Sequence, residues 1–181
     1  METVESIIIG GGPCGLSAAI EQKKKGIDTL VIEKGNVVEA IYNYPTHQTF
    51  FSSSDKLSIG DIPFIVEESK PRRNQALVYY REVVKHHQLR VNPFEEVLKV
   101  NKVDNRFTIT TTKGVYQSRF LTVATGYYGQ HNTLEVEGAE LSKSLITSKK
   151  RIHSSTKMLP LSVVRTQQSM QHSNLRKLAR M

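Results

Sequence analysis

The only cysteine of this 181-residue chain lies inside a glycine-rich segment near its start. Residues 7–15 have the sequence Ile-Ile-Ile-Gly-Gly-Gly-Pro-Cys-Gly, in which three glycines show the G-x-G-x-x-G spacing of a dinucleotide-binding loop. Such glycines permit a tight turn, close approach of a pyrophosphate, and close packing of helix on strand. The helix that follows presents N–H groups and partial positive charge to phosphate. The predicted cofactor-binding residues of this loop are Gly10, Gly12, Pro13, Cys14 and Gly15.

An acidic residue follows the loop at the interval expected for a ribose ligand. Residues 29–32 form a second apolar run, which ends at Glu33. A carboxylate roughly twenty residues beyond the glycines binds ribose hydroxyls in this type of unit. It favours a free 2′-hydroxyl, so we expect FAD or NAD rather than NADP at this first site. The neighbouring Lys34 is a further candidate contact, whereas the alternative for Glu33 is a solvated strand end.

The elements that must hold these residues follow in β-α-β order. Apolar patterning predicts strand, loop, helix and strand over residues 6–34, a helix over 73–87, strands over 94–103, 106–112 and 115–118, and a buried strand over 120–124. Residues 36–63 lack a clear period, and we expect them to cover the cofactor rather than to be disordered. Two side chains of this segment, His47 and Thr49, are candidate flavin contacts.

Charge and cysteine content exclude several classes of function. The net charge is +8, but residues 141–181 hold nine lysines and arginines and no acidic residue, so residues 1–140 are nearly neutral. We therefore predict no nucleic-acid partner. No apolar run approaches the roughly 18 residues of a membrane span, and the acidic start is no secretory signal, so we expect a cytoplasmic protein without a membrane partner. A single cysteine excludes a C-x-x-C pair, and the histidine spacing predicts no metal site.

Three segments resemble the bacillithiol disulfide reductase family of thioredoxin reductase-like flavoproteins. They are Gly-Gly-Gly-Pro-Cys-Gly-Leu-Ser-Ala-Ala-Ile (10–20), Ile-Tyr-Asn-Tyr-Pro-Thr-His (41–47) and Ala-Thr-Gly-Tyr-Tyr-Gly (124–129). The resemblance implies an α/β fold, a Rossmann-like FAD-binding domain whose parallel sheet carries a three-stranded β-meander. In that family the Ala-Thr-Gly segment returns the chain to the flavin before it enters the NAD(P)H domain. Thr125 and Gly126 are thus further expected FAD contacts.

The resemblance also implies an FAD- and NADPH-dependent oxidoreductase that reduces a low-molecular-weight disulfide such as bacillithiol disulfide. Cys14 is then the candidate catalytic residue, because a helix N-terminus favours the thiolate. The alternative is that Cys14 is only a small residue tolerated in the loop. For the whole chain, a flavin monooxygenase-like enzyme and a non-catalytic FAD-binding fragment remain alternatives. Homo-oligomerisation of the intact relative is left open.

Residues beyond Glu140 do not continue into the second glycine unit that the family requires. We expect residues 1–140 to be an incomplete FAD-binding Rossmann domain, truncated before the NAD(P)H domain and inactive alone. Residues 141–181 are expected to be a basic tail that is disordered or read out of frame. In a shifted reading frame, the third base of each codon is joined to the first two bases of the next codon. Residues 160–172 can then be read as Ile-Ile-Gly-Gly-Lys-Asn-Thr-Ala-Ile-Asp-Ala-Ala, which is typical of a strand followed by a glycine turn. We hypothesise a frameshift near Ser142; the alternative is an unrelated tail.

Overall fold

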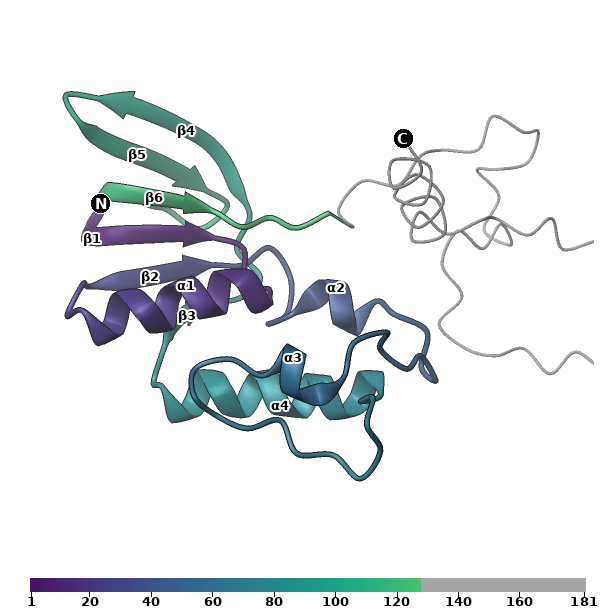
Figure 1. The fold of residues 1–181 in the computed structure, drawn as a ribbon. Coiled ribbons are helices and arrows are strands. Elements are labelled where there is room, and N and C mark those ends of the chain that lie inside the picture. The colour runs from purple at the N-terminus through teal and green to yellow at the C-terminus, as the bar shows by residue number, and fades with distance from the viewer. Residues whose placement is uncertain (128–181) are drawn as a thin grey trace, which may run out of the picture. The chain divides into compact units, whose positions relative to one another are not determined.

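The computed structural model describes residues 1–127, which form a six-stranded sheet in the order β3-β2-β1-β6-β5-β4 (Figure 1). Strands β3, β2, β1 and β6 are parallel to one another, whereas β4, β5 and β6 form an antiparallel meander. The strands are β1 (Glu2–Ile9), β2 (Thr29–Ile32), β3 (Arg90–Asn92), β4 (Val97–Val103), β5 (Arg106–Thr111) and β6 (Val115–Val123). The predicted α/β fold with a three-stranded meander is confirmed. The expectations for residues 128–181 lie outside the described residues.

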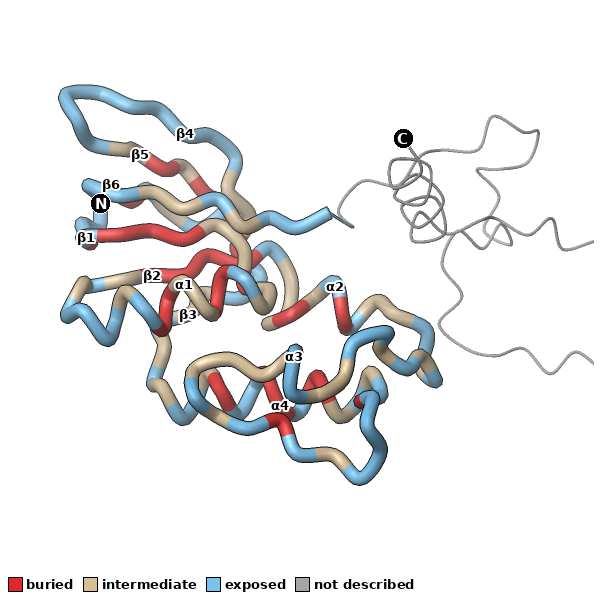
Figure 2. The backbone as a smooth tube through the Cα atoms, in the orientation of Figure 1, coloured by how far each residue is buried: buried red, intermediate tan, exposed pale blue. Residues whose placement is uncertain are grey.

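Helix α1 (Pro13–Lys24) packs against the centre of the sheet. Side chains alternate between the faces of a strand, and in β1 both faces are buried: Ile8 packs with Ala19 of α1, and Ile7 packs on the opposite face against Ile109 of β5. This explains the apolar runs at residues 7–9 of β1 and 30–32 of β2. Figure 2 shows the buried centre of the sheet, the exposed strand β4 and the exposed β4–β5 turn.

Helix α4 (Arg73–His86) confirms the helix predicted over residues 73–87. Its buried side chains belong to a second apolar cluster, which also contains Leu16 and Ile20 of α1. The segment 36–63 contains two short helices, α2 (Glu39–Tyr42) and α3 (Ser54–Leu57), and packs onto α4 through Val38 and Ile41. Isolated side chains, rather than one regular face, pack this segment onto α4. Its sequence therefore shows neither a helical nor a strand periodicity of apolar residues. Whether it covers a cofactor stays a prediction.

Three strands differ from the sequence-based expectation. The strand expected over 94–103 is β4, which begins only at Val97, because the positive φ of Phe94 interrupts extended backbone before it. β6 is one continuous strand, where separate strands over 115–118 and 120–124 were expected around the exposed Arg119. The strand is continuous because its first half pairs with β5 while nearly its whole length pairs with β1. β3 was not predicted, because three residues carry no periodic signal and only pairing with β2 defines the strand.

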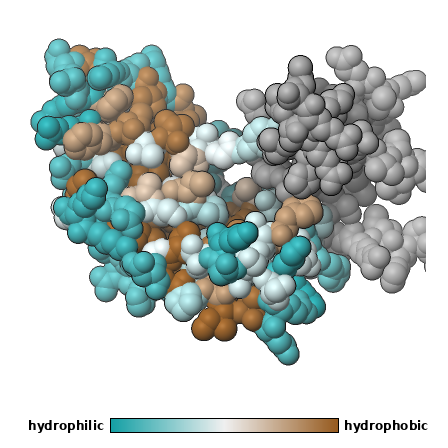
Figure 3. All heavy atoms as spheres, viewed as in Figure 1, coloured by the Kyte–Doolittle hydropathy of each residue, from teal (hydrophilic) through white to brown (hydrophobic). Residues whose placement is uncertain are grey.

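The outer part of the meander exposes apolar side chains. Figure 3 shows them as brown spheres over β4, β5 and β6 on the visible face. The large exposed apolar residues of β4 and β6 are Leu98, Val100, Val103, Val115, Phe120 and Val123. Within residues 1–127, β4 is also an edge strand of the sheet. An open edge beside exposed apolar side chains is an aggregation liability in isolation.

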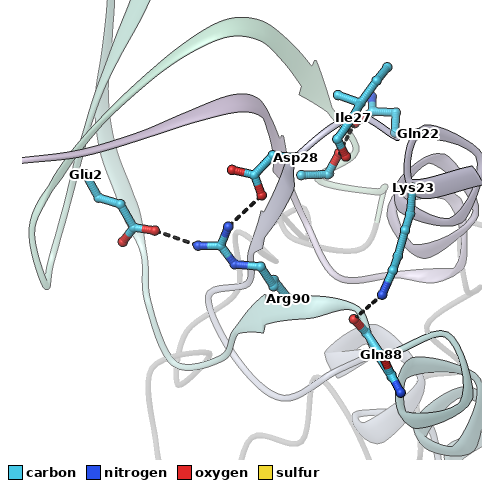
Figure 4. Close-up of polar contacts among 8 residues, drawn as sticks. Glu2, Gln22, Lys23, Ile27, Asp28, Gln88 and Arg90 are labelled. Atoms are coloured by element: carbon cyan, nitrogen blue, oxygen red, sulfur yellow. Dashed lines mark hydrogen bonds and ion pairs between the residues drawn. The ribbon is translucent and has the colours of Figure 1, made fainter. Parts of the chain in front are cut away.

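At the amino ends of the parallel strands, one arginine joins three of them (Figure 4). The guanidinium of Arg90, at the start of β3, donates to Asp28 before β2 and to Glu2 of β1, each at 2.6 Å. Nearby, Lys23 Nζ donates to the carbonyls of His87 and Gln88 at 2.7 and 2.8 Å. These contacts hold α1, α4 and the strand starts together at the end of the sheet opposite the glycine loop.

Replacing Arg90 with Met should lower the free energy of unfolding by about 0.5–1.5 kcal/mol, because two half-exposed ion pairs are lost and each is worth at most about 1 kcal/mol. The loss should shrink at high salt. Urea unfolding at low and high NaCl measures it. Lys85→Met, which removes the exposed pair with Glu82, is the control and should cost less. An Arg90→Met effect that is independent of salt would contradict the electrostatic interpretation.

Candidate functional site: the glycine loop and its neighbours

Two glycines of the loop are required by the packing of the fold itself. Gly10 has φ +110°, and a Cβ built there would lie 2.3 Å from the carbonyl oxygen of Ala124. A Cβ on Gly15 would lie 1.9 Å from the carbonyl oxygen of Gly10. Neither position has room for a side chain, so the ends of β1 and β6 and the first turn of α1 pack backbone against backbone.

Gly12 differs from these two glycines, because no packing contact within residues 1–127 requires it. Its φ of −77° suits any residue, and no atom of these residues lies within 4 Å of a Cβ built there. Gly12 is the N-cap of α1, so the space in front of it adjoins the helix N-terminus. A glycine that faces open space at this point permits the backbone to approach a phosphate closely. The loop therefore fits the pyrophosphate of a dinucleotide.

Glu33 lies directly behind the loop. Its Oε2 accepts the N–H of Gly11 at 2.5 Å, and its Oε1 accepts the N–H of Gly35 at 2.8 Å. The residue is 9 % exposed. Each carboxylate oxygen can accept a second hydrogen bond, so the side chain still has acceptor capacity for ribose hydroxyls. The sequence prediction placed this residue correctly beside the loop, while its role toward ribose stays a prediction.

Val38 orients the loop and could not be identified from the sequence. Its N–H donates to the carbonyl of Gly11 at 3.0 Å, its side chain is buried, and its φ is +55°. Left-handed backbone is rare for a β-branched residue. Because a trans peptide is planar, the N–H of Gly12 points to the side opposite the Gly11 carbonyl, away from Val38. No local sequence signal marks a valine for this conformation.

The end of β6 lies next to the loop. The N–H of Ala124 donates to the carbonyl of Ile9 at 2.8 Å, and the exposed Thr125 and Gly126 follow, the latter with φ +77°. The structure thus brings the segment 124–126 and the glycine loop to the carboxyl ends of neighbouring parallel strands. Ligands of open α/β sheets bind at this edge.

Three other predicted residues lie at the surface. Lys34 forms an exposed ion pair with Glu96 at 2.7 Å. His47 and Thr49 are exposed in segment 36–63, and Thr49 forms a β-bridge with Arg72. Among residues 1–127, no hydrogen bond joins the side chains of Lys34, His47 or Thr49 to the loop. Their contact with a cofactor stays a prediction.

Cys14 is exposed at the second position of α1, directly after Pro13. A small molecule can therefore reach its Sγ. The part of the chain that the structure describes contains no cluster of three potential metal ligands. It also contains no helix that is long and apolar enough to cross a membrane.

A buried polar network supports the turn that follows β3. The Thr111 hydroxyl donates to Glu95 Oε1 at 2.5 Å, and Asn92 Nδ2 donates to Glu95 Oε2 at 3.1 Å. Glu95 is 1 % exposed. Burial, and then the neighbouring Glu95 carboxylate, raise the pKa of Tyr116, so this phenol stays protonated. The network ties the residues beside Glu33 to the meander, and nothing in the local sequence predicted it.

Comparison with known proteins places these features in a family. Residues 7–164 match the family model described as pyridine nucleotide-disulphide oxidoreductase. The chain is 62 % identical to bacilliredoxin reductase Bdr of Bacillus subtilis over 140 residues, which are 77 % of this chain and 43 % of that protein.

Solved structures agree with this relationship. The bacillithiol disulfide reductase Bdr of Staphylococcus aureus is 87 % identical with a TM-score of 0.76, over 78 % of this chain and 44 % of that one. A flavin-containing monooxygenase of Stenotrophomonas maltophilia is 25 % identical with a TM-score of 0.68, over 75 % of this chain and 42 % of that one. The chain thus spans less than half the length of the relatives it matches.

The different environments of the glycines predict different effects of substitution. Gly12→Ser should leave the unfolding midpoint unchanged, because serine is a favoured N-cap and the site is open. It should weaken ADP binding at least about tenfold by filling the space for the phosphates. Gly15→Ala should instead lower the free energy of unfolding by about 1–3 kcal/mol or more through overpacking. Denaturation and calorimetric titration of the full chain measure both.

Gly114→Ser is the matched control, since Gly114 is equally open but lies in the β5–β6 turn. Equal loss of ADP affinity in Gly114→Ser and Gly12→Ser would contradict a specific phosphate site at the loop.

Proposed function

Because the chain belongs to the pyridine nucleotide-disulphide oxidoreductase family, we propose that it is the FAD-binding part of an enzyme that uses NADPH to reduce a low-molecular-weight disulfide. The observation that carries the FAD assignment is the open space at Gly12, directly before α1 and beside the Glu33 carboxylate. Gly10 and Gly15 are explained by packing, whereas the close approach of a ligand to the backbone accounts for Gly12 at the start of α1.

In this proposal each part of the site has one task. The loop and the N-terminus of α1 bind the pyrophosphate, and Glu33 accepts hydrogen bonds from the ribose. Thr125 and Gly126, at the end of β6, lie toward the flavin, with His47 and Thr49 as further contacts. FAD, when bound, transfers electron pairs between the nicotinamide and a disulfide. The protein supplies the position and the electrostatic environment of the cofactor.

The names of the relatives favour bacillithiol disulfide as the substrate. We assign the reaction with it to Cys14, whose side chain is exposed. Its thiolate attacks one sulfur of the disulfide, so that a mixed disulfide forms and the other sulfur leaves as a thiolate. The chain has no second cysteine. An electron pair from reduced flavin, or attack by a second small thiol, must then release Cys14.

A monooxygenase function has weaker support, since the matching monooxygenase shares 25 % identity, against 62 % for the B. subtilis reductase. No feature of residues 1–127 favours it over disulfide reduction. A cytoplasmic location of the whole protein belongs to the same proposal.

The full 181-residue chain should bind FAD, and Glu33→Gln should weaken that binding about 10- to 100-fold, because hydrogen bonds to a charged acceptor are lost. Quenching of flavin fluorescence measures the affinity. Glu96→Gln, which changes an exposed acid paired with Lys34, is the control and should bind like wild type. The same preparations should not oxidise NADPH steadily. A wild-type chain that fails to bind FAD would overturn the proposal.

Native chain mixed with bacillithiol disulfide should form one mixed disulfide at Cys14 and release one thiol, which mass spectrometry and thiol titration detect. Cys14→Ser should form none. If only the unfolded chain reacts, Cys14 is not accessible as the structure shows and the assignment fails.

A further inference from the structure

The inference below rests on the FAD-binding function proposed above. Given that function, the strand order assigns a place to each part of the bound FAD. The carboxyl ends of β3, β2, β1 and β6 are consecutive neighbours. The pyrophosphate fits the loop after β1, and the ribose fits Glu33 at the end of β2. Adenine is bonded to the ribose on the side away from the pyrophosphate. It therefore extends past β2, toward the turn at the carboxyl end of β3.

This turn, residues 92–95, is joined to the ribose segment by its backbone. The N–H of Glu33 donates to the carbonyl of Asn92 at 2.9 Å, and the N–H of Glu95 donates to the carbonyl of Glu33 at 2.9 Å. The N–H of Phe94 donates to the carbonyl of Gly35 at 3.0 Å. Phe94 is consequently fixed in position beside Glu33 and Gly35.

Two independent features of Phe94 are unfavourable for the stability of the folded protein. Its φ is +55°, in the left-handed region that disfavours a bulky side chain, and its side chain is 60 % exposed. The other non-glycine residues with positive φ in the described part of the chain are polar types or, in the case of Val38, fully buried. Phe94 alone among them combines a strained backbone with an exposed aromatic ring.

The surrounding structure holds this strained turn in place. Glu95, the next residue, is buried and hydrogen-bonded to Thr111 of β5 and to Asn92 of β3. Backbone strain persists where neighbouring contacts determine the conformation, and it gathers at ligand sites. A bound base accounts for the exposed ring, because an aromatic side chain provides a surface on which a purine stacks.

We propose that Phe94 contacts the adenine of the bound dinucleotide and makes the site selective for it. The ring supplies apolar and stacking contact at the end of β3, while Glu33 and the glycine loop supply the polar contacts.

The test compares ADP with ribose 5-diphosphate, which lacks the base, by calorimetric titration of the full chain. Phe94→Gly and Phe94→Leu should each weaken ADP binding about tenfold and change ribose 5-diphosphate binding less than twofold. Phe94→Tyr should retain ADP affinity. Phe94→Gly should unfold at or above the wild-type denaturant midpoint, since glycine suits φ +55° and the lost ring was exposed.

Gln88→Gly is the matched control, because Gln88 also has positive φ but lies next to the amino end of β3. It should leave ADP affinity unchanged. Wild-type ADP affinity in Phe94→Leu, or equal losses for both ligands, would overturn the inference and leave the proposed function intact. Failure of the wild-type chain to bind either ligand would instead overturn the proposed function.

Discussion

The contact of backbone against backbone at Gly10 determines the geometry of the nucleotide-binding end. With no Cβ at Gly10 or Gly15, the end of β1 lies against Ala124, directly after β6, on one side and against the first turn of α1 on the other. Only in this arrangement does the N–H of Gly11 reach Glu33 at the end of β2. The packing of the fold and the geometry of the binding loop thus have the same origin.

Much of this arrangement could be predicted from the sequence because the signals are local. The apolar run of β1, the glycine spacing and the interval to Glu33 act over a few residues each, and they identified the loop and its carboxylate. The spacing could not separate Gly12, which faces open space, from Gly10 and Gly15, which the packing requires. For Gly10 that distinction depends on Ala124, more than a hundred residues away in the chain, and for Gly15 it depends on how the loop folds back on Gly10.

The features that could not be predicted depend on contacts between distant segments. Val38 adopts a left-handed conformation because burial and its hydrogen bond to Gly11 hold it there. β3 exists only through its pairing with β2. Glu95 appears in the sequence as one of two adjacent acids, yet it is buried while Glu96 pairs with Lys34 at the surface. Pairing and burial of this kind leave no periodic trace in the sequence.

The two ends of the parallel sheet differ in character. The amino end is held by the ion pairs of Arg90 and the hydrogen bonds of Lys23, and the residues with positive φ there are the polar Gln88 and the glycine Gly26. Gly10, Val38, Phe94 and Gly126, all with positive φ, lie in the loops at the carboxyl end. Val38 and Phe94, the two apolar non-glycine residues with positive φ in residues 1–127, therefore both lie at the edge where α/β proteins bind ligands.

The double pairing of β6 also affects the order in which the molecule can fold. β1 pairs with β6 in the register Glu2–Tyr116, so the central strand finds one of its two neighbours 114 positions later in the chain. During synthesis the β1–α1–β2 unit emerges first, and β1 keeps an unpaired side until β6 leaves the ribosome. Closing so long a loop is entropically costly and slow. The nucleotide site, which needs Ala124 beside Gly10, is one of the last parts of the domain to form.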